Sequence, residues 1–76
     1  MRLRFKRDFE ESIFGDVSVW VATGDNNVYK VQENVLGNYI LIVTPFDEAF
    51  KMLPDSKVYD AESKGAAMDL AEAMEK

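Results

Sequence analysis

Hydrophobic and charged residues alternate over the first nine positions, MRLRFKRDF, which is the period-two pattern of a β-strand. One side of this strand carries Met1, Leu3, Phe5 and Phe9, and the other carries Arg2, Arg4, Lys6 and Asp8. Arg7 breaks the alternation. The pattern predicts a first strand over residues 1–9, with its hydrophobic side buried under helices.

Three further segments are rich in Val, Ile and aromatic residues and are separated by short polar turns. They cover residues 16–23, 28–33 and 39–44, with turns rich in Gly, Asp and Asn at 24–27 and 34–38. Chain order and short turns favour a meander. With the first strand, this predicts one small antiparallel β-sheet made of a three-stranded meander plus an N-terminal strand.

Both faces of the predicted sheet carry apolar residues. In the second segment Val17, Val19 and Val21 share one side, while Trp20 and Ala22 share the other. A sheet that is apolar on both sides must cover both, by its own chain or by a partner. We expect the valines to fill the covered face. Trp20 is then either a core residue or the anchor of a protein interface.

Two helices are predicted after the sheet. Thr44 and Pro45 begin a short helix that ends before Pro54, with Phe46, Phe50 and Leu53 facing the sheet. Residues 57–59 form a brief extended piece. The last helix begins near Ser63, or slightly earlier with Asp60 as its cap, and ends at about Glu75. Its apolar stripe is Ala67, Leu70, Ala71 and Met74. The predicted fold is a single α+β domain, residues 1–76, with both helices packed on one face.

Charge is distributed unevenly along the chain. The 76 residues carry a net charge of −5, yet four of the nine Lys and Arg lie in the first seven positions and all fourteen acidic residues follow. Residues 8–76 alone therefore carry −9. Such a body repels nucleic acid and acidic membranes and favours basic protein surfaces. The lack of cysteine and of any long apolar run predicts a cytoplasmic protein without a membrane partner.

The residues needed for common enzyme chemistry are sparse. Histidine and cysteine are absent, and the four glycines are scattered, so that no phosphate-binding loop is visible. Close acidic pairs such as Asp47 and Glu48 indicate a solvated acidic surface rather than the facing carboxylates of a glycosidase, and Asp25, Asn26 and Asn27 lack the calcium-loop spacing. We expect a protein that is not an enzyme and that needs no cofactor or metal.

Two function classes remain. The first is a non-enzymatic, acidic protein-interaction module, plausible as a phage or mobile-element inhibitor that blocks a basic, nucleic-acid-binding surface of a host or defence complex. It could also form a homodimer. Its candidate residues are Trp20, Tyr29, Tyr39, Asp69 and Glu72. The alternative is a nucleic-acid-binding domain that uses Arg2, Arg4, Lys6 and Arg7. Contacts between these cations and acids of the chain would make the basic strand structural, whereas free cations beside Trp20 would make it a binding surface.

Overall fold

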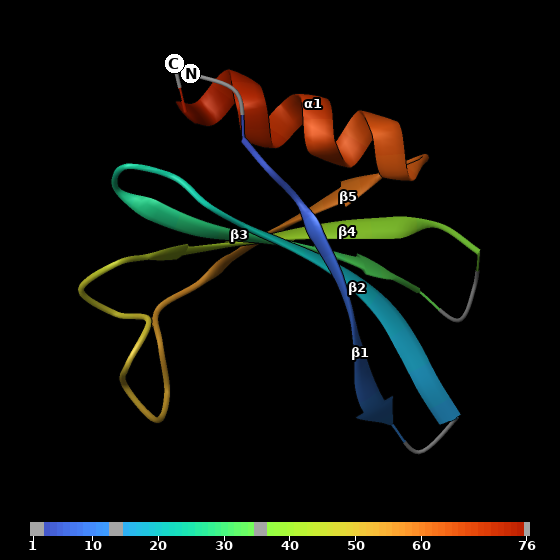
Figure 1. Ribbon diagram of the computed structural model, residues 1–76, viewed down its shortest axis with the longest axis horizontal. Coiled ribbons are helices and arrows are strands. Elements are labelled where there is room, and N and C mark those ends of the chain that lie inside the picture. The colour runs from blue at the N-terminus through green and yellow to red at the C-terminus, as the bar shows by residue number, and fades with distance from the viewer. Residues whose placement is uncertain (1–2, 13–14, 35–36, 76) are drawn as a thin grey trace.

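A computed structural model describes residues 3–12, 15–34 and 37–75 of the chain (Figure 1). Its elements follow the order β1 (Lys6–Ser12), β2 (Gly15–Thr23), β3 (Asn27–Glu33), β4 (Tyr39–Pro45), β5 (Lys57–Ala61) and α1 (Lys64–Glu75). The five strands form one sheet in the order β1-β2-β3-β4-β5, and every neighbouring pair is antiparallel. The sheet is strongly twisted, and α1 lies across one of its faces (Figure 1).

Short turns set the register of the central strands. The amide of Gly24 donates to the carbonyl of Asn27 at 2.9 Å between β2 and β3. After β3, the amide of Gly37 donates to the carbonyl of Asn34 at 2.9 Å. Gly37 has a φ of 93°, a left-handed conformation that glycine adopts without a steric penalty. These turns fold the segments into the meander that their sequence pattern predicts.

The core lies between α1 and the face of the sheet that carries Tyr29, Val31 and Leu41, all 0% exposed. Ala67 and Ala71 of α1 are also 0% exposed, and their small side chains allow the helix to approach the strands closely. Leu3 and Ala22 complete the buried cluster, while Phe5, Trp20, Tyr39 and Tyr59 pack around its margin. Burial of this face against α1 is the main apolar contribution to the fold.

The C-terminal helix is confirmed by the structure. Ser63 caps its N-terminus, because the Ser63 hydroxyl oxygen accepts a hydrogen bond from the amide of Ala66 at 3.1 Å. Its other end is held by Glu75, whose carboxylate accepts from the hydroxyl of Tyr29 at 2.6 Å and from the amide of Asp25. Gly24 permits this contact, since a Cβ there would lie 2.2 Å from the Glu75 carboxylate.

The predicted short helix does not form, and the sheet has a fifth strand. Pro45 ends β4, and residues 46–50 form successive turns in which the amides of Glu48, Ala49 and Lys51 bond three residues back, at 3.0–3.2 Å. A helix bounded by two prolines and lacking a packed side is too short to be stable. The chain instead returns along β4 as β5, with Leu41 opposite Tyr59 in the register. The prediction of a four-stranded sheet with two helices was therefore wrong.

The predicted faces of the sheet were also reversed. Trp20 and Ala22 lie on the face covered by α1, and the valines of β2 lie on the opposite face. Trp20 and the tyrosines each bury more apolar area than a valine, and Ala22 leaves room for the alanines of α1. In the first segment Leu3 and Phe5 pack in or against the core as expected, but Phe9 is 58% exposed. Met1 lies outside the described residues.

Candidate protein interface

The face of the sheet opposite α1, here called the open face, is apolar at its centre. Alternate residues of four strands place aliphatic side chains there, and these are Val17, Val19, Val21, Val28, Ile40, Ile42 and Val58. Val58 at the edge is 60% exposed, Val19 at the centre is only 1% exposed, and the others are half-buried. Within the described part of the chain, no helix covers this face (Figure 1). A small domain rarely leaves such a surface to water unless it binds something.

Polar residues complete the open face in two regular rows that run across the strands. One row, in register order, is Asp8, Val19, Gln32, Ile40 and Asp60. The neighbouring row is Lys6, Val21, Lys30, Ile42 and Val58. The first row therefore has carboxylates and the second has ammonium groups, with aliphatic side chains on β2 and β4 in both. The rows lie about 7 Å apart, because two residues along a strand separate them.

Residues 46–56, here called the apolar loop, extend this surface beyond the strands. Phe50, Met52 and Leu53 are 92%, 99% and 91% exposed, although each is a large hydrophobic side chain. An ion pair between Lys51 and Glu48 at 2.8 Å lies within the loop. At its base the hydroxyls of Thr44 and Ser56 share a hydrogen bond of 2.6 Å. Exposure to water of three large hydrophobic side chains within four residues is unfavourable, and burial by a partner would remove that free-energy cost.

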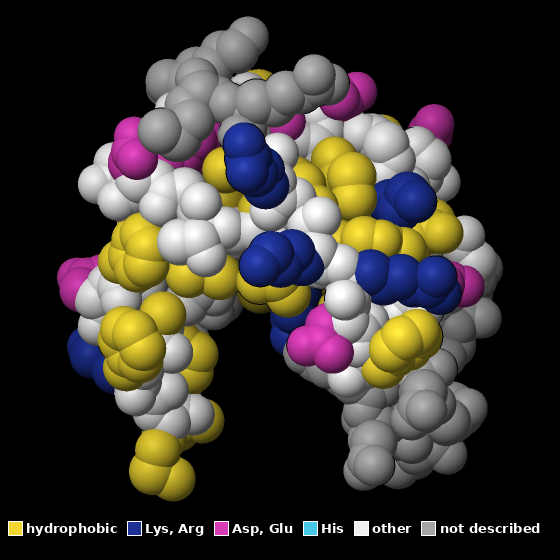
Figure 2. All heavy atoms as spheres, viewed as in Figure 1, with side chains coloured by type: hydrophobic (Ala, Val, Ile, Leu, Met, Phe, Trp, Pro, Cys, Tyr) yellow, Lys and Arg dark blue, Asp and Glu magenta, His cyan; other side chains and the backbone are white. Residues whose placement is uncertain are grey.

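A groove of about 250 Å³ joins the apolar loop to the open face. Ala49, Pro54 and Ser56 form its loop side, and its floor consists of strand residues Val21, Val28, Lys30, Ile42 and Thr44. Figure 2 shows that the molecule is hollowed on the side away from α1, with the hydrophobic side chains of the loop projecting beside the hollow. Sheet, groove and loop form one continuous apolar surface.

The structure places the predicted protein-binding residues elsewhere. Trp20 is half-buried on the covered face, with its ring centroid 6.2 Å from that of Tyr39 and the Lys64 ammonium 4.9 Å from its ring. Tyr29 is 0% exposed, and burial, followed by its hydrogen bond to Glu75, raises the pKa of its hydroxyl. Asp69 is exposed on α1, whereas Glu72 is half-buried there. Trp20 and Tyr29 therefore contribute to the core, and Asp69 remains on the surface.

The basic residues of the first strand divide between the two faces. Arg7 lies beside Trp20: its guanidinium is 5.9 Å from the Trp20 ring and 5.0 Å from the Phe9 ring, and it donates to the Ser18 hydroxyl at 3.2 Å. Lys6 is on the open face, opposite Val21 in the register. Arg4 is exposed, and Arg2 lies outside the described residues. Figure 2 shows several Lys and Arg side chains interleaved with hydrophobic ones where β1 crosses the front of the molecule.

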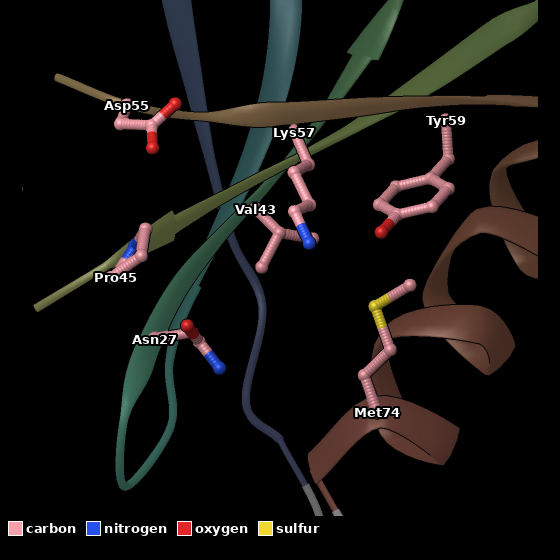
Figure 3. Close-up of a pocket in the computed structure, with 7 residues that line it drawn as sticks. All are labelled: Asn27, Val43, Pro45, Asp55, Lys57, Tyr59 and Met74. Carbon is pink, nitrogen blue, oxygen red and sulfur yellow. The ribbon is translucent and has the colours of Figure 1, made fainter.

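A second cavity, of about 310 Å³, lies beside the C-terminal end of α1 (Figure 3). It is lined by Asn27, Val43, Pro45, Asp55, Lys57, Tyr59 and Met74. The side chains of Lys57, Tyr59 and Met74 point toward a shared space (Figure 3). Among the described residues, no three acidic side chains are close enough to hold a metal ion. Its volume is at the lower end of the range of small-molecule sites.

The apolar loop is the exposed surface feature that the sequence interpretation missed. Phe46, Phe50 and Leu53 have helical spacing, which predicted a packed helix, but Phe50 and Leu53 are almost fully exposed. The two prolines that bracket the segment are the signal that could have identified a loop. No helix in the part of the chain described is long and apolar enough to cross a membrane.

Comparisons of the chain with protein-family models, with curated proteins and with solved structures find no match. The function therefore has to be argued from the surface of the molecule.

Proposed function

We propose that this protein is a non-enzymatic protein-interaction module whose contact surface is the open face together with the apolar loop. The observation that carries the proposal is the exposure of Phe50, Met52 and Leu53 next to a half-buried Val and Ile surface. Protein interfaces have an apolar centre with a polar rim, and here Lys6, Asp8 and Asp60 supply that rim. The surface is arranged for contact with protein rather than for chemistry on a small molecule.

The proposal also includes binding of a different protein, which has a basic surface. The support is electrostatic, since the chain carries −5 overall and Asp69 is exposed on the outer side of α1. Opposite charges steer association and discourage wrong partners. Because α1 and the open face are on opposite sides of the sheet, both surfaces could be occupied together (Figure 1). An acidic module of this kind could block a nucleic-acid-binding surface of its partner by occupying it.

Photo-crosslinking tests the contact surface directly. A photoreactive amino acid at Met52 should give a covalent protein adduct in cell extract, because that side chain is 99% exposed within the proposed interface. The matched control is the same amino acid at Glu33, which is exposed at the end of β3 and belongs to neither the open face nor α1. Equal adduct yields at the two positions, or none above background at Met52, would contradict the proposal.

Capture of a basic partner is tested separately. The double variant Asp69→Lys with Glu72→Lys reverses the charge on α1 and should reduce recovery of a basic protein by about tenfold or more, as rim charges act mainly on association. A variant that recovers the same proteins as the wild type, in the same amounts, would remove the basic partner from the proposal. The crosslinking result at Met52 would be unaffected by that outcome.

Nucleic acid is a second candidate because Arg7 lies between two aromatic rings near the exposed Arg4. Cations interleaved with aromatic side chains are the pattern of single-strand binding surfaces. The replacement of Arg4, Lys6 and Arg7 by Ala should then abolish a fluorescence-anisotropy change with a single-stranded oligonucleotide at about 50 mM salt, where electrostatic binding is strong. No change with the wild-type protein under those conditions would exclude this candidate.

A further inference from the structure

We propose that the occupant of the open face is a second copy of this chain, bound face to face about a two-fold axis. This inference rests on the proposed function, because it uses the same surface and names what covers it. The register of the sheet, the charges of the two rows and the area of the open face all favour a second copy.

The two rows of the open face are complementary to each other across all the central strands. From β1 to β4 they pair Asp8 with Lys6, Val19 with Val21, Gln32 with Lys30, and Ile40 with Ile42. A two-fold axis that lies in the interface, parallel to the rows and midway between them, places each row opposite the other row of the second copy. Ile40 then meets Ile42, Val21 lies over the already buried Val19, and opposite charges meet at the β1 edge.

Symmetry makes each of these contacts occur twice. Lys6 of one copy faces Asp8 of the second copy, and Asp8 of the first faces Lys6 of the second. At the β5 edge Asp60 faces Val58, and both are exposed, so this one mismatch falls at the rim where the carboxylate keeps its water. An unrelated protein would have no reason to match both rows in this way.

The surface approaches the size of a standard protein interface. Five strands about 4.8 Å apart and about seven residues long give a sheet area on the order of 500 Å². The side chains of Phe50, Met52 and Leu53 extend this area, toward the roughly 800 Å² per partner of a standard interface. Two sheets packed face to face lie about 10 Å apart, as in a β-sandwich.

The net charge of the chain does not oppose this arrangement. In the dimer the two α1 helices lie on the outer sides with both sheets between them, since α1 is opposite the open face (Figure 1). Their acidic residues are then farther apart than the roughly 8 Å over which charges interact at physiological salt. Each copy also keeps its exposed Asp69 available to a basic partner.

Charge exchange between the rows tests the arrangement, with dimer dissociation constants measured by sedimentation equilibrium. Lys6→Asp and Asp8→Lys each place like charges opposite one another in two symmetric contacts, so each should weaken the dimer by about tenfold. The double variant with both changes restores the complementarity and should return the dissociation constant to within about twofold of the wild type. Both residues are exposed, and folding is checked by circular dichroism.

A second variant tests the apolar centre. Ile42→Glu places an unpaired carboxylate opposite Ile40 of the second copy and should give a folded monomer at every concentration up to about 100 μM. The matched control, Ala73→Glu on the exposed surface of α1, should leave the dimer unchanged. If Ile42→Glu does not fold, the charge-exchange series alone decides the outcome.

Three results would overturn the inference. They are a wild-type chain that is monomeric at 100 μM, a dimer that Ile42→Glu leaves intact, and a double charge exchange that fails to restore dimerisation. If the chain is monomeric but still gives an adduct with a different protein at Met52, the inference of a second copy is wrong. The proposed function then still stands. A monomer without any adduct above the Glu33 control contradicts both.

Discussion

The two faces of the sheet use the same strands but have opposite environments. On β4 the consecutive residues Leu41 and Ile42 point to opposite sides, and Leu41 is 0% exposed under α1 while Ile42 is half-buried on the open face. On β3 Val31 and Val28 differ in the same way. Both faces are apolar, yet the described residues contain one helix, and it covers only one of them. Apart from the buried Val19, the open face is therefore the less covered side of the sheet.

The largest effect should come from truncating the covered face. Leu41→Ala should lower the free energy of unfolding by about 3 kcal/mol, because it removes a fully buried side chain and leaves a cavity. Ile42→Ala, one residue away, should cost about 1 kcal/mol or less at concentrations where the protein is monomeric. Urea denaturation of both variants measures the difference. Equal losses would show that the two faces are equally buried in the single chain.

Glu75, at the C-terminal end of α1, should make the free energy of unfolding depend on pH. The hydrogen bond from Tyr29, followed by that from the Asp25 amide, holds the pKa of the Glu75 carboxylate below its ordinary value of 4.5. The folded state is thus stabilised above that pH, and this contribution is lost as the pH falls through the lowered pKa. Between about pH 6 and about pH 3, Glu75→Gln should lose less stability than the wild type. Parallel losses in urea titrations would contradict this role.

A smaller effect on stability is expected at Trp20, at the margin of the covered face. Lys64→Ala removes the ammonium that lies 4.9 Å from the Trp20 ring and should cost about 0.5–1 kcal/mol. Lys51→Ala is the matched control, since Lys51 makes only an exposed ion pair within the apolar loop. Thermal unfolding followed by Trp20 fluorescence distinguishes the two. A Lys64 variant as stable as the Lys51 variant would show that the contact contributes nothing.

The smallest effect on the single chain should come from the apolar loop. Replacement of Phe50, Met52 and Leu53 by Ser should change the stability of the monomer by about 0.5 kcal/mol or less, because these side chains bury almost nothing within it. The same variant should reduce binding of an apolar dye to the surface. A loss of several kcal/mol would mean that the loop packs on its own sheet.

The sequence predicted the elements whose patterns are long and regular. The meander turns have Gly and Asn at the required positions, and the Ala67–Leu70–Ala71–Met74 stripe has the period of a helix on a sheet. The fifth strand was predicted only as a brief extended piece over residues 57–59, because KVYDA is short and three of its five side chains are charged or at an exposed edge. The apolar loop resembled a helix, because helical spacing and chance spacing look the same over eight residues.

The sequence predicted an apolar surface on the sheet, and the structure decides which face α1 covers. The sequence shows that both faces of β2 are apolar, so a surface in need of cover could be expected. It does not show which face α1 selects, since that depends on how Ala67 and Ala71 fit against Ala22 and the aromatic residues around it. Packing of this kind is decided in three dimensions, and as a result Trp20 packs at the margin of the core while the valines of β2 lie on the opposite face.

The central claim is that a second copy covers the open face, and contacts between differently labelled copies test it most directly. In an isotope-filtered nuclear Overhauser experiment on a mixture of labelled and unlabelled chains, we expect intermolecular signals between the methyl groups of Ile42 in one copy and those of Ile40 in the other. Signals that connect only α1 residues of the two copies, or no intermolecular signal from the open-face methyl groups, would contradict the account.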